Sequence, residues 1–212
     1  MLMKTLFNNK IVTLCLIFLY KNSYSQGLYG SEITPEIVKP PSCEVISPDG
    51  GQYQINKVQA HHIKRNDSFQ LPEMNKTWLV ICDIPVSLFL QFIDNRKDSS
   101  PIDNNYFGLG NVNGNGKLGA YQIILNHAKI DDKPARIYVK DNATNGDSDK
   151  IIVSDNHIYG FSLNDNNITN GEKFSINILV KSKLNSLKET NGPLIDGAEL
   201  DGSAELIFSF GI

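Results

Sequence analysis

The chain has 212 residues, of which 41% are hydrophobic, and a formal net charge of −3 at pH 7. This composition is typical of a globular protein with a buried core. A slightly acidic chain lacks the excess of basic residues with which proteins bind nucleic acid or anionic membrane surfaces, so we expect neither as a partner.

The first 25 residues have the parts of a secretory signal peptide. Lys4 and Lys10 make its start positive, residues 11–20 form an apolar run, and small residues precede the expected cleavage after Ser25. The run is too short to span a bilayer, although an uncleaved anchor is the alternative. We therefore predict a signal peptide over residues 1–25, export of the protein, and no membrane insertion of the mature chain.

Cleavage changes both the charge and the cysteine count. The removed segment contains three lysines and no acidic residue, which leaves 17 basic and 23 acidic residues, a net charge of −6. Cys15 is also removed, so Cys43 and Cys82 remain as an even pair. In an oxidising compartment such a pair predicts one disulfide. Two metal-ligating thiols are the alternative, but the chain lacks the close cysteine spacing of zinc sites.

The mature chain then starts with an N-terminal extension over residues 26–37. Tyr29, Ile33 and Ile37 are apolar at roughly even spacing, and prolines in this segment remove backbone donors. These features favour an extended arm, and a disordered tail is the alternative. The folded domain is expected over residues 38–212.

The C-terminal residues follow a period of two. Every second position is apolar or small, at Ala204, Leu206, Phe208, Phe210 and Ile212. This period puts these side chains on one face of a β-strand. We expect this strand either to close a complete sandwich or to border an open groove that another chain can fill.

The strongest core pattern lies at Thr77–Asp94. Trp78–Cys82 is nearly continuous in apolar residues, as in a strand buried on both faces. Asp83–Pro85 interrupts the pattern, which resumes with alternating apolar residues at Val86–Ile93. We predict two consecutive strands that meet at a corner.

Further strand patterns recur between turn-forming residues, and no segment has a convincing helical period. They lie at 38–46, 53–58, 106–130 with a glycine-rich turn, 135–139, 150–153, 158–163 and 174–184. About ten short strands with closely spaced turns predict an all-β sandwich of immunoglobulin-like type.

We expect no enzyme, no metal site and no cofactor. The chain has none of the common nucleophile, zinc-protease or phosphate-loop motifs. His61 and His62 are neighbours, which on a strand would point to opposite faces, so we predict solvated side chains. Asn111, Asn113 and Asn115 have the spacing of a calcium loop but carry no carboxylate, which favours a turn.

Six short motifs follow one another between residues 38 and 212. They are Val38-x-Pro40-x-x-Cys43, Val80-x-Cys82-Asp83-x-Pro85, Asp94-Asn95-Arg96, Phe107-Gly108-Leu109-Gly110, Lys117-x-Gly119-Ala120-Tyr121 and Leu200-Asp201-Gly202-Ser203-Ala204. In this order they resemble fimbrial subunits of the chaperone–usher type, and more narrowly the beta-fimbrial group of pilin-like proteins.

The resemblance implies an immunoglobulin-like sandwich that lacks its final strand, and an exported subunit of a cell-surface fimbrium that supports adhesion. A periplasmic chaperone would lend a strand to the groove, and an outer-membrane usher would assemble the subunits. The N-terminal arm of a neighbouring subunit would then replace the chaperone strand. The resemblance also implies a disulfide between the first and second strands, which matches Cys43 and Cys82. Such pilins typically carry an aromatic penultimate residue, where this chain has Gly211.

A second hypothesis comes from a different class of protein. The chain could be a self-contained secreted or surface sandwich that binds a ligand such as a glycan. The two hypotheses differ in one property that can be measured, namely whether the mature chain folds and stays monomeric on its own.

Overall fold

A computed structural model describes the greater part of the chain. The described ranges are 40–54, 59–140, 149–163, 168–195 and 197–211. The predicted signal peptide, the predicted arm with Tyr29, Ile33 and Ile37, and the C-terminal Ile212 lie outside these ranges.

The described residues form strands and two short 3-10 helices, which confirms the all-β prediction. Within these ranges, no helix is long and apolar enough to cross a membrane. The 3-10 helices are η1 (Pro48–Gly51) and η2 (Ala60–His62). The strands are β1 (Cys43–Ile46), β2 (Phe69–Gln70), β3 (Met74–Asp94), β4 (Phe107–Gly108), β5 (Asn111–Val112), β6 (Gly116–Lys117), β7 (Gly119–Ile130), β8 (Lys133–Pro134), β9 (Arg136–Val139), β10 (Lys150–Ile152), β11 (Ile158–Ser162), β12 (Gly171–Leu184) and β13 (Ala204–Gly211).

Strand β3 organises the sheet, because it is the longest described strand and pairs with four others, two along each half. The sheet follows the order β10-β7-β12-β3-β11-β9, and all its pairs are antiparallel. Strands β1 and β13 also pair with β3, while β5 and β6 form a separate hairpin. The first half of β3 pairs with β12 and β1, and the second half pairs with β11 and β13.

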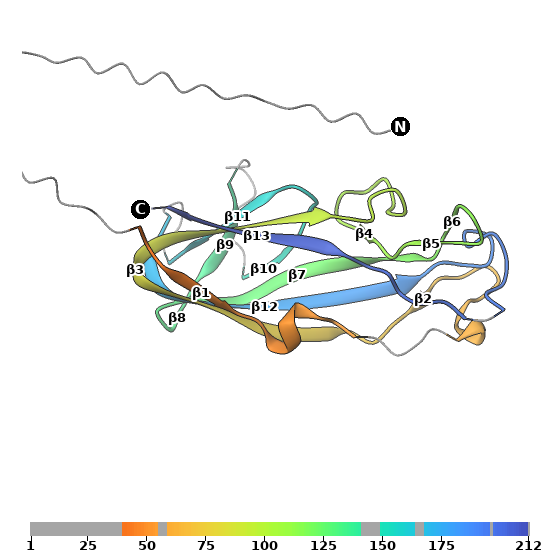
Figure 1. Ribbon diagram of the computed structural model, residues 1–212, viewed down its shortest axis with the longest axis horizontal. Helices are drawn as coiled ribbons and strands as arrows, with labels where there is room; N and C mark the ends of the chain where they lie inside the picture. The colour runs from red at the N-terminus through yellow and green to blue at the C-terminus, as the bar shows by residue number, and fades with distance from the viewer. Residues whose placement is uncertain (1–39, 55–58, 141–148, 164–167, 196, 212) are drawn as a thin grey trace, which may run out of the picture. The chain divides into compact units, whose positions relative to one another are not determined.

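Strand β3 doubles back on itself at one end, so that its halves lie in opposite layers (Figure 1). The sequence predicted two strands meeting at a corner over Thr77–Asp94, and the structure has one continuous strand instead. Pro85 lies at the bend, between Cys82 and Val86, where the ladders with the flanking strands are interrupted. A proline there removes no ladder hydrogen bond, which is why the strand continues through it.

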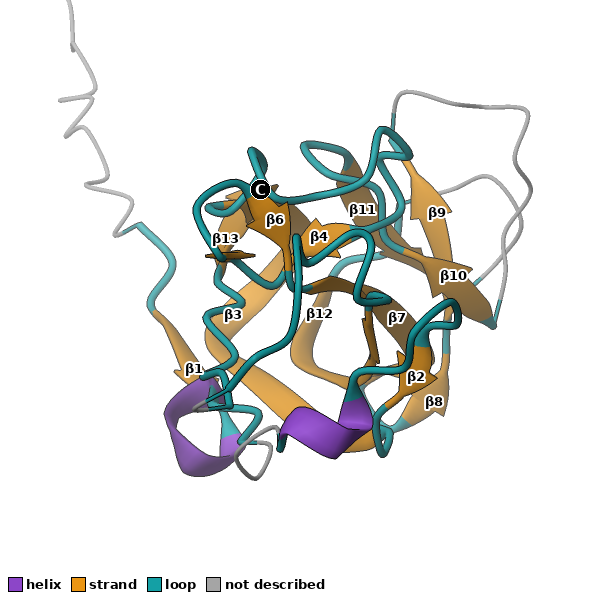
Figure 2. Ribbon diagram, turned by 90° about the vertical axis from the view of Figure 1, so that its right-hand side faces the viewer, coloured by secondary structure: helices purple, strands orange, loops and turns teal. Residues whose placement is uncertain are grey.

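The core fills the space between the two layers. Phe161 of β11 and Phe174 of β12 come from opposite layers, and their ring centroids are 5.9 Å apart. Both side chains are almost fully buried, as are Leu125 and Ile137. Seen from the end, the strands curl around this core (Figure 2). Burying each such side chain contributes roughly 1.5–3 kcal/mol, so this core is the main source of stability.

Two local predictions have different outcomes. The glycine-rich segment forms a turn between β5 and β6, as predicted, and Asn113 and Gly114 have φ of 47° and 85°. Both values lie in the left-handed region that asparagine and glycine tolerate best. His61 and His62, which were predicted to be solvated, lie in η2. His61 is exposed, whereas His62 is half-buried and stacks on Phe69 with centroids 5.0 Å apart.

Candidate functional site

The C-terminal strand β13 lies at an edge of the sheet. Its ladder with β3 extends from Ala204 opposite Asp94 to Gly211 opposite Ser87. Among the described residues, β13 pairs with no other strand. The long alternating strand that the sequence predicted is therefore present, and it is paired on one edge.

The inward-facing side chains of β13 are incompletely covered, although their neighbours on β3 are buried. Phe210 lies opposite Leu88 and shares its face of the sheet. Leu88 is 2% exposed and Phe210 is 38% exposed. Leu206 and Phe208 are half-buried beside a buried Phe92 and a buried Leu90. The inner-face side chains of β3 are thus covered, whereas those of β13 are partly exposed.

The backbone groups at the free edge of β13 belong to the same inward-facing residues. The Asn95 N–H donates to the Ser203 carbonyl across the directly opposed pair at 3.0 Å. Hydrogen-bonded pairs alternate along an antiparallel ladder, so odd-numbered residues of β13 bond to β3. The amide and carbonyl groups of Leu206, Phe208 and Phe210 therefore point away from β3. A strand placed beside β13 would meet these groups and their apolar side chains together.

The N-terminal strand β1 has the same property in the opposite layer. The Asp83 N–H donates to the Ser42 carbonyl at 3.0 Å, which sets an alternation that turns Val45 towards the free edge. Val45 is 38% exposed, and Val80 opposite it is 2% exposed. In the described part of the chain, β1 pairs only with β3.

The predicted disulfide holds β1 to β3 and is confirmed. Cys43 and Cys82 are bonded, with their Cα atoms 4.1 Å apart, and they are directly opposed in the ladder. The ladder of β1 contains four residue pairs, so few backbone hydrogen bonds hold this edge strand. The disulfide therefore fixes one border of the open region.

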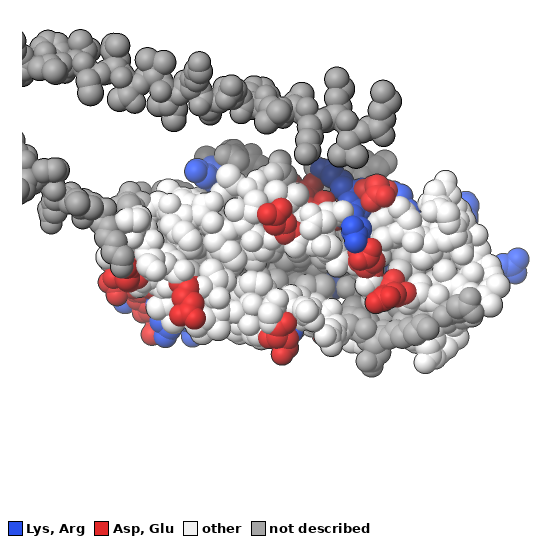
Figure 3. All heavy atoms as spheres, in the orientation of Figure 1, with Lys and Arg blue, Asp and Glu red and all other residues white. Residues whose placement is uncertain are grey.

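An open groove lies between β1 and β13. In both views the two strands are on the same side of the described unit, in opposite layers (Figures 1 and 2). A cavity of about 950 Å³ lies beside the first residues of β13, and its lining includes no residue of β1. Its walls are mainly apolar, with Trp78, Phe92, Ile178 and Leu206 among them, and Glu199 is their one charged side chain in the described residues. The space-filling view shows this face as largely uncharged and hollowed between the layers (Figure 3).

An aromatic cluster lines the groove, with Tyr53 and Trp78 as its members. The Trp78 indole N–H donates to the Tyr53 hydroxyl at 3.2 Å, and that hydroxyl donates to the Ile178 carbonyl at 3.0 Å. Burial raises the pKa of Tyr53, although the hydrogen bond from Trp78 acts in the opposite direction. Trp78 also lies against Phe208, with ring centroids 6.3 Å apart. Side chains from the two layers therefore meet at Phe208.

The segment that leads into β13 is held in place by polar contacts and by close packing. Arg96 holds this segment through Asp201, with the Arg96 Nη2 and Asp201 Oδ2 atoms 2.7 Å apart. The Asp201 N–H also donates to the Leu109 carbonyl. Gly202 lies so close to Leu109 and Tyr121 that a Cβ atom there would be 2.9 Å from the leucine side chain. Residues of this segment line the cavity beside the start of β13.

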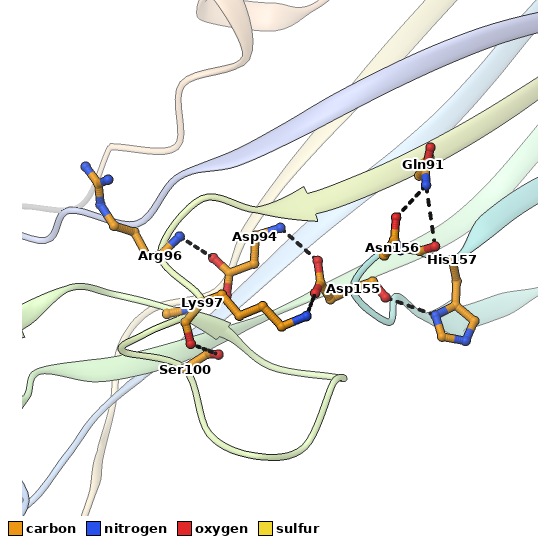
Figure 4. Close-up of polar contacts among 9 residues, drawn as sticks. Gln91, Asp94, Arg96, Lys97, Ser100, Asp155, Asn156 and His157 are labelled. Carbon is orange, nitrogen blue, oxygen red and sulfur yellow. Dashed lines mark hydrogen bonds and ion pairs between the residues drawn. The ribbon is translucent and has the colours of Figure 1, made fainter.

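A second polar cluster fixes the end of β3 where β13 begins (Figure 4). The Asp94 carboxylate accepts hydrogen bonds from the Arg96 N–H at 2.8 Å and the Gly108 N–H at 2.9 Å. The Asp94 N–H in turn donates to the Asp155 carboxylate, which also accepts from Lys97. Burial alone would raise the pKa of Asp155, but these hydrogen bonds outweigh it and lower the pKa below its ordinary value. The polar groups of this cluster bond to one another, so we assign the cluster a structural role.

The remaining sequence predictions can be placed on this geometry. Leu206, Phe208 and Phe210 lie along one border of the groove, and Ala204 and Leu206 line the cavity at its start. The described residues contain no group of three or more acidic, histidine or cysteine side chains that could hold a metal. Tyr53 and Asp155 were missed, because their partners are distant in the sequence and no local pattern marks them.

Comparison with known proteins does not assign this arrangement to a family. No family model, no curated protein and no solved structure matches the chain.

Proposed function

We propose that the chain is a structural subunit of a chaperone–usher surface fimbria that polymerises by strand exchange. In this proposal the groove between β1 and β13 is the place of a missing strand, and the fold is an incomplete immunoglobulin-like sandwich. A periplasmic chaperone supplies the strand first, and a neighbouring subunit supplies it in the fibre. An outer-membrane usher carries the subunits to the cell surface, where the fibre supports adhesion.

The observation that carries the proposal is the coincidence of two unsatisfied features along β13. Apolar side chains are exposed there, and the backbone groups of the same residues have no partner strand among the described residues. An added strand covers both at once, because β-augmentation supplies backbone hydrogen bonds and alternating side chains. A small ligand would satisfy the side chains and leave most of the ladder unpaired.

The proposal is tested by expressing the mature chain with and without an added strand. The unmodified chain should aggregate or be degraded, because an exposed apolar edge is a template for pairing. An alternating apolar strand fused after Ile212 by a flexible linker should give a monomer with a cooperative thermal transition. A matched control strand has the same composition in an order without alternation.

The glycan-binding alternative makes the opposite prediction. A self-contained sandwich folds alone, stays monomeric, and has the same melting temperature with either fused strand. That result would overturn the fimbrial proposal. Binding of the unmodified monomer to immobilised glycans would then be the next measurement.

A further inference from the structure

The cavity beside the start of β13 lies beyond the ladder of β1. Strand β1 pairs with residues 79–82 of β3, whereas the cavity is lined by Met74 and Trp78, which precede them. Met74 lies near the start of β3 and Phe92, also in the lining, near its end, so the cavity is at the end of the layers away from the bend (Figure 1). Residues 51–54, which follow β1 in the chain, form part of its wall.

The cavity is also distinct from the most exposed part of β13. Its lining includes Leu206 but neither Phe208 nor Phe210. Phe208 follows between Leu206 and Phe210 on the same face, and its ring contacts that of Trp78 with centroids 6.3 Å apart. A strand that pairs with the free edge beside Phe208 and Phe210 therefore leaves the question of what occupies this cavity.

The size and the walls of the cavity are those of a ligand site. Protein interiors are packed about as densely as organic crystals, and few of their voids exceed a water molecule. Ligand pockets have volumes of about 300–1,000 Å³ and mainly apolar walls with a few polar groups. The cavity of about 950 Å³ has both properties, so it is too large to be a packing defect.

Most polar side chains of the wall are already bonded within the wall. The Trp78 indole N–H donates to the Tyr53 hydroxyl, which donates to the Ile178 carbonyl. The Gln54 side-chain amide donates to the Gln52 side-chain oxygen at 3.0 Å. These bonds leave the aromatic rings and aliphatic side chains as the surface that a ligand meets, so the body of the ligand should be apolar.

Glu199 is the exception in this wall. It is the one charged side chain among the described lining residues, and it makes no ion pair or hydrogen bond with the described part of the chain. Asp201, two residues further on, is by contrast paired with Arg96. A carboxylate at the border of an apolar cavity attracts a cation and repels an anion, and the low dielectric of the cavity strengthens both effects.

We propose that this cavity binds an apolar molecule that carries a basic amino group. The hydrocarbon part lies against Trp78 and Phe92, and the ammonium group pairs with Glu199. This inference goes beyond the proposed function and does not depend on it, because the cavity lining includes no residue of β1 and neither of the two most C-terminal phenylalanines of β13.

The test uses Trp78 as its reporter, since Trp78 is the only tryptophan of the chain. Dodecylamine, dodecanol and dodecanoate have the same hydrocarbon chain and differ in charge at neutral pH. Each is titrated below its micelle concentration into the strand-fused mature chain, or into the unmodified mature chain if that stays monomeric. Dodecylamine should give a saturable change in Trp78 emission and bind several-fold more tightly than dodecanoate, with dodecanol between them.

The first variant tests the charge. Glu199→Gln should bring the affinities for dodecylamine and dodecanoate together and leave the affinity for dodecanol unchanged. The matched control is Glu205→Gln, because Glu205 is exposed on the outer face of β13 and is absent from the cavity lining. The control should keep the full difference between the amine and the carboxylate.

The second variant tests the place. Ala204→Phe puts a ring into the cavity and should weaken the binding of all three probes. Ala204 is half-buried and lies outside the fully buried core, so the variant should keep the cooperative thermal transition of the parent. The matched control is Ser209→Phe on the outer face of β13, which should bind the probes as the parent does.

The possible outcomes separate this inference from the proposed function. Equal affinities for the three probes, a preference that Glu199→Gln keeps, or binding that Ala204→Phe leaves unchanged would each overturn the inference. A strand-fused chain that unfolds cooperatively but gives no saturable change would also overturn it and would leave the proposed function intact. Preferential binding of dodecylamine by a chain that folds alone and responds to no strand would support the inference and overturn the proposed function.

Discussion

Strands β12 and β13 have the same alternating pattern in the sequence and different surroundings in the fold. Both pair with β3, but β12 has β7 along its other edge, whereas no described strand pairs with the other edge of β13. Phe174 of β12 is 1% exposed and Phe210 of β13 is 38% exposed. An alternating pattern therefore decides which face of a strand is apolar, while its neighbours decide whether that face is covered.

The comparison explains why an exposed apolar strand is informative here. Isolated apolar side chains on a protein surface are common and need no explanation. On β13, apolar side chains that are half-buried or exposed recur at every second position, beside residues of β3 that are buried. The inner face of the sheet is covered at β3 and partly uncovered at β13. The uncovered part lies on the side towards β1.

The largest effect is expected for Phe174→Ala in β12. Its ring is buried between the layers against Phe161, so its removal leaves a cavity in the core. Such substitutions cost about 3–5 kcal/mol. We expect a loss of this size in denaturant unfolding of the strand-fused mature chain, with Ile207→Ala on the outer face of β13 as a control. A loss no larger than that of the control would mean that the Phe174 ring is not buried in the core.

The next largest effect is expected for replacing Cys43 and Cys82 by alanine together. The disulfide closes a loop with a sequence separation of 39 residues, and in the chain-entropy model this contributes about 4 kcal/mol. Without the disulfide, only four ladder pairs hold β1 to β3. Strand β1 should therefore detach from β3 before the other strands unfold. Hydrogen exchange of the β1 amides should become fast in the double variant and remain slow in the parent. Equal protection in both would show that the short ladder alone is sufficient.

The strands β12 and β13 could be predicted from the sequence, because an alternation of apolar residues with a period of two is a local signal. The disulfide could be predicted because only two cysteines remain after residue 25. The continuity of β3 could not be predicted, since it depends on Pro85 falling where the adjacent ladders are interrupted. The aromatic cluster was also missed, because Tyr53 belongs to no strand and meets Trp78 only through the fold.

A smaller effect, and one that depends on pH, is expected for Asp155→Asn at the start of the β13 ladder. The lowered pKa of Asp155 means that its carboxylate stabilises the fold above the ordinary carboxyl pKa of about 3.9. That contribution is lost as the pH falls through the lower pKa of the folded state. Hydrogen bonds to a charged group contribute about 1.5–3 kcal/mol, and we expect the lower end because Lys97 is exposed.

The Asp155 prediction is measured as the difference in unfolding free energy between parent and variant across pH. The difference should be constant near neutrality and should shrink in acid below about pH 4. The matched control is Asp132→Asn, since Asp132 is exposed and bonded to Lys173 on the surface. A difference that stays constant into acid would exclude the carboxylate charge as its cause.

The smallest effect in the strand-free chain is expected for Phe210→Ser, and it should grow when the groove is filled. Full burial of a phenylalanine contributes roughly 1.5–3 kcal/mol, and a ring that is 38% exposed contributes less, about 1 kcal/mol. An added strand covers this ring, so the cost of the substitution should rise into the full range. The measurement is denaturant unfolding of the parent and the variant, each with and without the fused strand, at low protein concentration. Ser209→Ala on the outer face is the control and should cost the same in both forms. An equal cost for Phe210→Ser with and without the strand would mean that the added strand does not lie over β13, even if it stabilises the protein in another way.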